Sequence, residues 1–366
     1  MDVPQSPAEV VDALEAWLAP AGDPGAHPEP LVVTTSGSTG VPKRVRLSRR
    51  AVLASAAASA RRVGAAGPWL LTLPAGYVAG LNVIARSLLA GHRPVIADEH
   101  PSFAAAAHAL VAAHPDADRF VSLVPTQLHR MLDGSPEHAT DVEALRSFHT
   151  VLLGGGPVDA ALRARAAAAG VRVVATYGSA ETCGGCVYDG VPLDGTGLAL
   201  GTDGRVRLSG PTLFDGYETP AGTLDEQLTA GSLVDGWFLT SDAGRLDDDG
   251  RLQVLGRLDD VVVTGGVNVP APAVAAVLRA TAGVRQAEVV GVPDEEWGNA
   301  LVALVVPTDA GHPPDLERLR AAVAAERPRS WAPRRLVLLE DLPLLANGKP
   351  DRLALQRLAR ATGGEA

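Results

Sequence analysis

Short apolar runs alternate with alanine- and leucine-rich segments of helical length in the first half of this 366-residue chain. The apolar runs are LVV at residues 31–33, WLLTL at 69–73, PVIA at 94–97, FVSLV at 120–124, TVLLG at 150–154 and VRVVA at 171–175. Strands that are buried on both faces of a parallel sheet form such continuous runs, and helices connect them. The pattern predicts repeated strand–helix units, with helices at about residues 7–18 and 78–89 and functional loops at the strand ends.

The rhythm changes after about Gly195, where short strands separated by glycine and aspartate predict an antiparallel β subdomain. Beyond GRLDD at residues 256–260, the pattern becomes strand, helix at 270–282, strands at 286–292 and 300–306, helix at 315–326 and strand at 335–339. We therefore predict an α/β protein of two domains. The large N-terminal domain, residues 1–258, has mainly parallel sheets layered with helices plus the β subdomain, and residues 259–366 form a small, mobile C-terminal α/β domain.

A loop of small hydroxyl residues, glycines and one lysine follows the first apolar run, with the sequence TTSGSTGVPK at residues 34–43. Its glycines let backbone N–H groups approach anionic oxygens, its hydroxyls can donate hydrogen bonds, and its lysine adds a positive charge. The spacing is not that of a Walker A loop, since Pro42 precedes the lysine and no magnesium-binding hydroxyl follows it. We expect this loop to bind a polyphosphate through Thr35, Ser36, Gly37, Ser38, Thr39, Gly40 and Lys43.

Three further motifs follow in order: TYGSAET at residues 176–182, FLTSDAGRLDDDGRLQVLGRLDD at 238–260 and LPLLANGKPDR at 342–352. Together the four segments resemble the motifs of the adenylate-forming superfamily of acyl-CoA synthetases, peptide-synthetase adenylation domains and luciferases. The resemblance implies an enzyme that activates a carboxylic acid with ATP and Mg²⁺, forms an acyl-AMP and transfers the acyl group to CoA. Only 33 residues precede the loop, whereas family members usually carry a whole extra subdomain there.

The resemblance also implies which residues bind the nucleotide. Glu181 would bind Mg²⁺, because magnesium prefers hard carboxylate oxygens, and Thr182 would donate to the α-phosphate. Without the other motifs, an ordinary helix N-terminus would be the better interpretation of this pair. A plain strand-ending turn is the alternative for the glycines of GGGP at residues 154–157. Those glycines resemble the adenine-binding segment of the family, and aspartate and arginine would contact the ribose. The expected contacts are Gly154, Gly155, Gly156, Tyr177, Gly178, Asp242 and Arg257.

Lys349 occupies the position of the family's adenylation lysine, and it joins Thr182 and Glu181 as an expected catalytic residue. The resemblance implies that Lys349 bridges the substrate carboxylate and the α-phosphate. It further implies that the small domain then rotates about a hinge at Asp259. This rotation would bring VVVTGGVN at residues 261–268, with Gly265 and Gly266, to the thiol of CoA. The family's glutamate and aromatic positions after that segment are replaced in VPAPAVAAVL at residues 269–278.

The segment LPAGYVAGLNVIARSLLAGHRPVI at residues 73–96 lines up with the family stretch that contributes to the acyl pocket. An arginine at a similar distance, followed by a Leu-x-Ala-Gly end, occurs in the o-succinylbenzoate–CoA ligases of menaquinone synthesis. The short chain also resembles actinobacterial members of that group. Such an arginine can pair with a second carboxylate of the acid, and a surface arginine is the alternative. The expected acid contacts are Tyr77, Arg86 and Ser179.

The resemblance implies a small carboxylic acid, ATP and CoA as partners, with a homodimer left open. The formal net charge is −10, and no tract rich in lysine and arginine occurs, so we expect no nucleic-acid partner. No basic leader with an apolar core and no run of 18 strongly apolar residues occurs, so we expect a cytoplasmic enzyme without membrane insertion. Cys183 and Cys186 have the spacing of a redox pair or half a zinc site, but no further ligands are suitably spaced, and we assign them no role.

Two other kinds of function stay open. One is a different aryl- or acyl-CoA ligase, or a free-standing amino-acid adenylating enzyme; no carrier domain follows, which favours a CoA ligase. The other is a degenerate ATP-binding protein without catalysis. The joint presence of Lys43, Glu181, Asp242, Arg257 and Lys349 argues against that alternative. The sequence does not decide which acid is activated.

Overall fold

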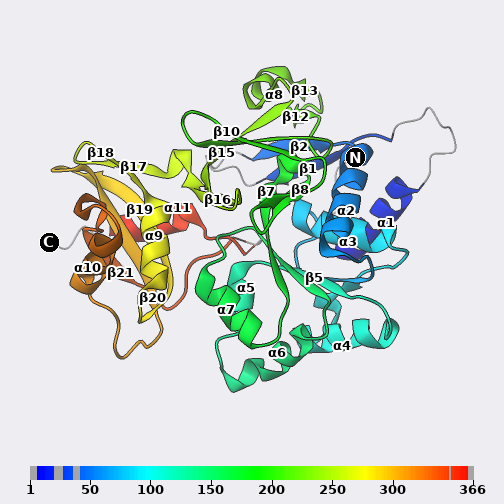
Figure 1. Ribbon diagram of the computed structural model, residues 1–366, viewed down its shortest axis with the longest axis horizontal. Coiled ribbons are helices and arrows are strands. Elements are labelled where there is room, and N and C mark those ends of the chain that lie inside the picture. Colours follow the sequence, from blue (N-terminus) through cyan, green and yellow to red (C-terminus); the bar gives the residue numbers. More distant parts are fainter. Residues whose placement is uncertain (1–5, 20–27, 36–41, 346–347, 362–366) are drawn as a thin grey trace. The chain divides into compact units, whose positions relative to one another are not determined.

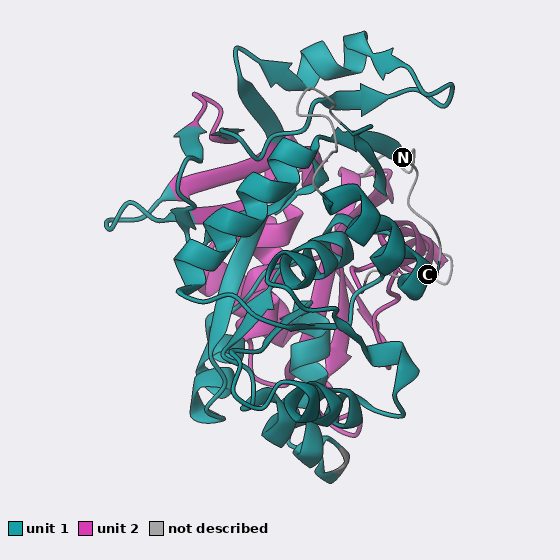
Figure 2. Cartoon of the chain, turned by 90° about the vertical axis from the view of Figure 1, so that its right-hand side faces the viewer, with its two compact units in different colours: residues 1–199, 207–240, 246–252 teal, residues 200–206, 241–245, 253–366 magenta. Residues whose placement is uncertain are grey.

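The computed structural model describes residues 6–19, 28–35, 42–345 and 348–361 (Figure 1). The chain divides into two compact units, which Figure 2 colours separately. The large unit contains Met1–Ala199, Arg207–Thr240 and Leu246–Leu252, and the small unit contains Leu200–Val206, Ser241–Arg245 and Gln253–Ala366. Both units mix helices and strands, as predicted, and the domain boundary after residue 258 stays a prediction.

A seven-stranded sheet in the order β4-β3-β5-β6-β7-β8-β9 organises the large unit. The five strands from β4 to β7 are parallel, and β8 and β9 continue the sheet in antiparallel pairs. Parallel neighbours require crossover connections, and helices supply them here. The strands are β3 (Trp69–Leu71), β4 (Val95–Ile96), β5 (Phe120–Leu123), β6 (Thr150–Leu153), β7 (Val173–Ser179), β8 (Gly184–Tyr188) and β9 (Val191–Pro192).

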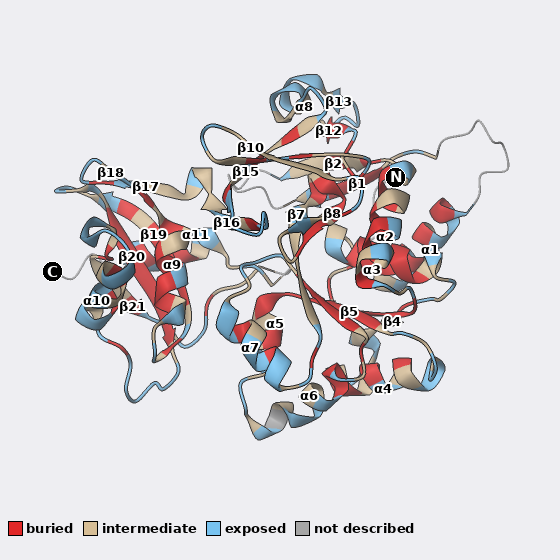
Figure 3. Cartoon of the chain, in the orientation of Figure 1, coloured by how far each residue is buried: buried red, intermediate tan, exposed pale blue. Residues whose placement is uncertain are grey.

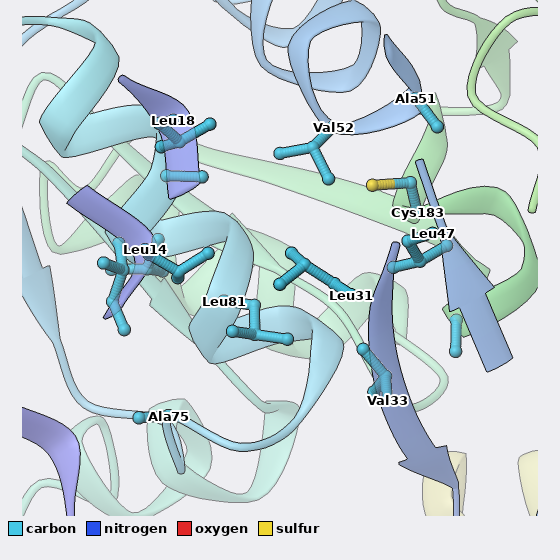
Figure 4. Close-up of a cluster of buried hydrophobic side chains, with 14 of the residues drawn as sticks. Leu14, Leu18, Leu31, Val33, Leu47, Ala51, Val52, Ala75, Leu81 and Cys183 are labelled. Carbon is cyan, nitrogen blue, oxygen red and sulfur yellow. The ribbon is translucent and has the colours of Figure 1, made fainter. Parts of the chain in front are cut away.

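Successive residues of these strands enter two different hydrophobic cores, because neighbouring side chains of a strand point to opposite faces. On β5, Phe120 belongs to one core and Val121 to the other. The first core includes residues of α1 (Pro7–Leu18), α2 (Arg49–Val63) and α3 (Val78–Leu89), and part of it is drawn in Figure 4. The second includes residues of α4 (Phe103–Ala113), α5 (Pro125–Met131), α6 (Ala139–Leu145) and α7 (Ala160–Ala168). The central strands β5 and β6 are therefore buried on both faces, and Figure 3 shows β5 in the colour of buried residues.

Two further sheets are assembled from strands that lie far apart in the sequence. The first has the order β1-β2-β12-β13 and is antiparallel throughout. Its strands are β1 (Leu31–Thr35), β2 (Lys43–Leu47), β12 (Gly216–Glu218) and β13 (Leu224–Asp225). The second has the order β10-β11-β15-β14, with β16 also paired to β15. Its strands, together with the intervening helix α8, are β10 (Gly197–Leu200), β11 (Arg205–Ser209), α8 (Glu226–Ser232), β14 (Leu233–Val234), β15 (Trp237–Leu246) and β16 (Leu252–Arg257).

The small unit contains a three-stranded sheet, β19-β20-β21, with helices on both faces. Alternate residues of β20 pack with α9 and α10 on one face and with α11 on the other. A two-stranded hairpin, β17-β18, precedes α9. The elements are β17 (Val261–Thr264), β18 (Val267–Pro270), α9 (Ala271–Ala280), β19 (Val284–Asp294), β20 (Gly298–Pro307), α10 (Leu316–Glu326), β21 (Arg335–Leu338) and α11 (Arg352–Ala361).

The predicted helices at residues 7–18 and 78–89 are confirmed at those bounds as α1 and α3. The helix predicted at residues 270–282 is shorter, because Pro270 ends β18 and Thr281 is already extended. The two antiparallel strands at the end of the main sheet were not distinguished from its parallel strands by the apolar pattern. Among the described residues, no helix combines the length and the apolar character that a membrane crossing requires.

Helix α11 offers a matched test of the small unit's packing. Leu355 is 0% exposed and belongs to the core against β20, whereas Leu353 on the same helix is 58% exposed. We expect Leu355→Ala to lower the free energy of unfolding by about 2–5 kcal/mol, because it removes buried methyl groups and leaves a cavity. Leu353→Ala should change it by less than about 0.5 kcal/mol. Urea unfolding followed by circular dichroism measures both, and equal losses would contradict this packing.

Candidate active site

Neighbouring segments at the carboxyl edge of the main sheet approach so closely that a side chain is excluded at two predicted nucleotide contacts. A Cβ atom on Gly154 would lie 2.4 Å from the Thr176 hydroxyl oxygen, and one on Gly178 would lie 2.1 Å from the Gly184 carbonyl oxygen. Tyr177, which is half-buried, lies in the same stretch of β7. The GGGP and TYG segments are therefore neighbours on this edge, and in open α/β sheets ligands bind at the carboxyl edge.

Glu181 and Thr182 lie on a single 3₁₀ turn, Ala180–Thr182, which reverses the chain between β7 and β8. The Thr182 hydroxyl accepts a hydrogen bond from the Ser179 N–H (2.9 Å) and donates one to the Gly184 carbonyl (2.7 Å), so it holds the turn together. A strand follows, so the turn is not the N-terminus of an α-helix. Phosphate binding by Thr182 stays a prediction and would require its hydroxyl to exchange partners.

Glu181 has a partner that the sequence did not reveal. The Tyr217 hydroxyl donates a hydrogen bond to Glu181 Oε1 at 2.8 Å, and Lys43 Nζ lies 5.1 Å from the centroid of the same ring. Burial, followed by the nearby Glu181 carboxylate, raises the pKa of Tyr217, so the phenol keeps the proton it donates. Tyr217 reaches this place because β12 pairs with β2, a contact between distant segments that no local pattern indicates.

The predicted phosphate loop connects β1 to β2. Thr35 and Lys43 face each other as the last pair of this hairpin, and the Thr35 hydroxyl lies 3.5 Å from the Lys43 carbonyl oxygen. Between them, Ser36, Gly37, Ser38, Thr39 and Gly40 lie outside the described residues. Their phosphate contacts stay predictions. The hairpin nevertheless places Lys43 beside Tyr217, and Tyr217 beside Glu181.

The predicted acid contacts lie at different points along α3. Tyr77 directly precedes the helix, and Arg86 lies in its last turn, about 13 Å further along the axis at 1.5 Å per residue. Arg86 is only 9% exposed, and its guanidinium carbon lies 5.5 Å from the centroid of the Trp69 ring. It is therefore not a surface arginine. Ser179, the third predicted contact, has a buried hydroxyl oxygen without a hydrogen-bond partner among the described residues.

Arg86 lines a cavity of about 350 Å³ whose other walls come mainly from α2 and the end of α3. The walls are largely apolar and include Leu53, Ala56, Val63, Trp69 and Leu89. Within the described part of the chain, Arg86 Nε is buried without a hydrogen-bond partner. A buried guanidinium N–H without a hydrogen-bond partner is costly, so the cavity favours an anionic group beside Arg86.

In the small unit, two arginine–aspartate pairs bracket the short turn Leu258–Asp260. Arg257 donates two hydrogen bonds to Asp259, at 2.7 and 2.8 Å, so the structure pairs a predicted ribose contact with the predicted hinge. Arg352, at the start of α11, donates to both carboxylate oxygens of Asp260. Burial, and then the charge of Arg257, lower the pKa of Arg352, while Asp259 and Asp242 oppose them. Asp242 therefore belongs to the same charged group, of which sequence reasoning missed Asp260 and Arg352.

The predicted CoA and adenylation residues lie on two tight turns of the small unit. Gly265 and Gly266 connect β17 to β18 with φ of +55° and +75°. A Cβ atom on Gly265 would lie 2.7 Å from the Trp297 ring, so a side chain is excluded there. Lys349 is exposed on a turn that is closed by a hydrogen bond from the Leu345 N–H to the Lys349 carbonyl (2.8 Å). The roles of these three residues stay predictions.

The two cysteines are free and buried beside the Glu181 turn. Burial raises the pKa of both thiols to about 12. The Cys183 carbonyl accepts hydrogen bonds from Ser55 (3.1 Å) and Asn82 (2.9 Å), which tie the turn to α2 and α3. No group of three or more His, Cys, Asp and Glu side chains is gathered for a metal among the described residues.

Comparison with known proteins identifies the family. Residues 7–217 match the model of the AMP-binding enzyme family, and residues 273–349 match that of the AMP-binding enzyme C-terminal domain. The chain belongs to the AMP-binding enzyme family. The first match contains the segments at residues 34–43 and 176–182, and the second ends at Lys349; the third motif, residues 238–260, lies between the two matches.

Within the AMP-binding family, the chain is 42% identical over 336 residues to a Mycobacterium tuberculosis protein named "Probable 2-succinylbenzoate–CoA ligase", with 89% of this chain and 84% of that protein covered. It is 32% identical to an indoleacetate–CoA ligase from Aromatoleum aromaticum, covering 92% and 69%. A solved structure of the o-succinylbenzoate CoA synthetase from Bacillus subtilis with its acyl-adenylate intermediate is also similar. The TM-score is 0.73 at 27% identity, covering 89% of this chain and 68% of that one.

The buried thiols generate a prediction about reactivity. Because burial raises their pKa to about 12, Cys183 and Cys186 remain protonated at every lower pH, and the reactive thiolate is scarce. We expect iodoacetamide to modify neither cysteine of the native protein near pH 8, and both after denaturation. Mass spectrometry of the alkylated protein counts the modified sites, and rapid native labelling would contradict the buried placement.

Proposed function

We propose that this protein is an ATP-dependent acid–CoA ligase that acts on 2-succinylbenzoate through an acyl-AMP intermediate. Family membership and the named relatives support the ligase reaction. The observation that carries the choice of acid is Arg86, a buried cation without a hydrogen-bond partner for Nε among the described residues, facing a mainly apolar cavity. An acid with an aromatic body and a second carboxylate matches both features.

The reaction has two steps in this proposal. The acid's carboxylate oxygen attacks the α-phosphorus of ATP and pyrophosphate leaves; the CoA thiol then attacks the acyl carbon and AMP leaves. Negative charge accumulates on the phosphates in the first step, so positive groups at this point contribute most. We assign this neutralisation of phosphate charge to Lys43 and Lys349. Lys349 acts in the first step only.

Glu181 is the proposed ligand for Mg²⁺, and its surroundings fit the ion. One carboxylate oxygen accepts the Tyr217 hydrogen bond, and the other has no hydrogen bond to any described residue. A hard oxygen with free lone pairs suits magnesium, which supplies charge neutralisation to the phosphates when it is bound. The carboxyl edge of β7 carries Glu181, so the ion and the nucleotide motifs would share this edge.

Arg86 is the proposed contact for the second carboxylate of the acid. The cavity walls are mainly apolar, and an ion pair gains strength where the local dielectric constant is low. The separation of Tyr77 and Arg86 along α3 then sets the distance between the activated and the distal carboxylate. An indoleacetate-like acid has no second carboxylate and would leave Arg86 without an anion, so we rank such a monocarboxylate second.

The direct experiment is a substrate panel. Purified protein with ATP, Mg²⁺ and CoA is given 2-succinylbenzoate, benzoate, indoleacetate, fatty acids or amino acids, and CoA thioesters are measured by mass spectrometry. We expect the 2-succinylbenzoyl thioester to form with the highest kcat/KM. Preference for a monocarboxylate would overturn the substrate assignment, and absence of thioester from every acid would overturn the ligase reaction.

Arg86→Ala tests the distal contact. We expect kcat/KM for 2-succinylbenzoate to fall by an amount equivalent to roughly 2–5 kcal/mol, because one partner of a buried ion pair is lost, with the KM for ATP little changed. Arg61→Ala is the matched control, since this neighbouring arginine on α2 is exposed and pairs with Asp194. Unchanged kinetics in the Arg86 variant would exclude the contact.

Lys349→Ala tests the assignment of the lysine to the first step. We expect acyl-AMP formation to slow by about a hundredfold or more, the scale for one electrostatic donor. Thioester formation from acyl-AMP supplied directly should be largely spared. Rapid-quench measurement of the two half-reactions separates them, and equal damage to both would show that Lys349 does not act in adenylation alone.

A further inference from the structure

Tyr217 contacts two residues of the candidate site through different parts of one side chain. Its hydroxyl donates to Glu181 Oε1, and its ring lies next to the Lys43 ammonium group. We infer that Tyr217 is a positioning residue that fixes the Glu181 carboxylate for the metal–nucleotide complex. The inference rests on the proposed function, in which Glu181 binds Mg²⁺, and it assigns a role to a residue outside the sequence motifs discussed above.

The Tyr217 side chain is itself held in one place. It is 2% exposed and packs edge-on against Phe214, with ring centroids 4.9 Å apart. Its backbone N–H donates to the Thr229 hydroxyl at 2.9 Å, and β12 pairs it with Val45 of β2. The hydroxyl of so constrained a ring can hold the Glu181 carboxylate in one orientation, because the donor itself moves little.

The segment that carries Tyr217 holds Glu181 at two points. The Phe214 N–H donates to the Glu181 backbone carbonyl at 2.9 Å, and the Tyr217 hydroxyl donates to the side chain at 2.8 Å. Backbone and carboxylate are thus both fixed relative to β12. With one carboxylate oxygen taken by the phenol, the other has no hydrogen bond to any described residue and is the oxygen available to a cation.

Lys43 makes the arrangement specific to the nucleotide site. Its ammonium group lies within the range of a cation–π contact with the Tyr217 ring. The same side chain therefore contacts the Lys43 ammonium group through its ring and the Glu181 carboxylate through its hydroxyl. Replacement of tyrosine by phenylalanine keeps this ring and its packing and removes only the hydroxyl. Tyr217→Phe therefore removes the hydrogen bond to Glu181, along with the contact of the same hydroxyl to Ser232, and keeps the ring.

The test compares ATP affinity with and without the metal. Isothermal titration gives the Kd of ATP in EDTA and in excess Mg²⁺. The ratio of the Kd in EDTA to the Kd in Mg²⁺ measures how much the ion strengthens ATP binding. We expect Tyr217→Phe to reduce this ratio by about tenfold, as for other groups that orient metal ligands, and to leave the Kd in EDTA unchanged. The melting temperature should stay close to that of the wild type.

Tyr188→Phe is the matched control. Tyr188 is also buried, and its hydroxyl hydrogen-bonds to the Ser59 hydroxyl at 2.8 Å, without contact to Glu181. Its removal should leave the Mg²⁺ ratio unchanged. The inference is overturned if Tyr217→Phe keeps the wild-type ratio, if it weakens ATP binding equally with and without the ion, or if the Tyr188 variant loses as much.

The titration needs neither acid nor CoA, so it separates this inference from the proposed function. A wild-type protein that binds ATP more tightly with Mg²⁺ but makes no CoA thioester would overturn the proposed function and leave the role of Tyr217 intact. A wild-type protein whose ATP affinity ignores Mg²⁺ would overturn both.

Discussion

The reversal of the chain between β7 and β8 is the constraint on which the candidate site depends. Five parallel strands would carry the chain away from the carboxyl edge, but β8 pairs antiparallel with β7 and returns at once. The return requires Gly178 beside the Gly184 carbonyl and a left-handed Cys183 with φ of 52°. It leaves Glu181 at the edge, where Tyr217 meets it from another sheet. The backbone geometry of this reversal thus determines where the Glu181 carboxylate lies.

The sequence predicted the elements that depend on local pattern. Helix α3 has a wide apolar face and is buried along most of its length, so its periodicity set its bounds correctly. The motifs of the main sheet came together at one edge because parallel strands end on the same side. What the sequence did not predict depends on pairing between distant segments. Tyr217 is adjacent to Glu181 only through the β2–β12 register, and Arg352 reaches Asp260 only because α11 packs back on the small sheet.

Charged side chains are rare in the interior of this protein and common on its surface. Among the described residues, Arg86 is the one charged residue in the buried set, and its neighbour Trp69 presents a π face to it. Such a site is expensive for an empty protein and favourable for a charged ligand, since the ligand supplies the missing counter-charge. Stability and specificity are therefore linked at this residue: the guanidinium that we propose selects a dianionic acid has a buried Nε without a hydrogen-bond partner among the described residues.

Lys43, at the base of the hairpin, and Lys349, on its exposed turn, are the only two lysines of the chain; the other 30 of its 32 basic side chains are arginines. An acyl adenylate is a mixed anhydride that acylates neutral amines. Guanidinium groups stay protonated at any physiological pH and do not compete as nucleophiles. A ligase with this inventory offers an escaping intermediate almost no side-chain amine on its own surface, so self-acylation would fall on the two lysines assigned to the reaction. Acylation by the enzyme's own acyl adenylate would therefore inactivate it at the proposed active-site lysines.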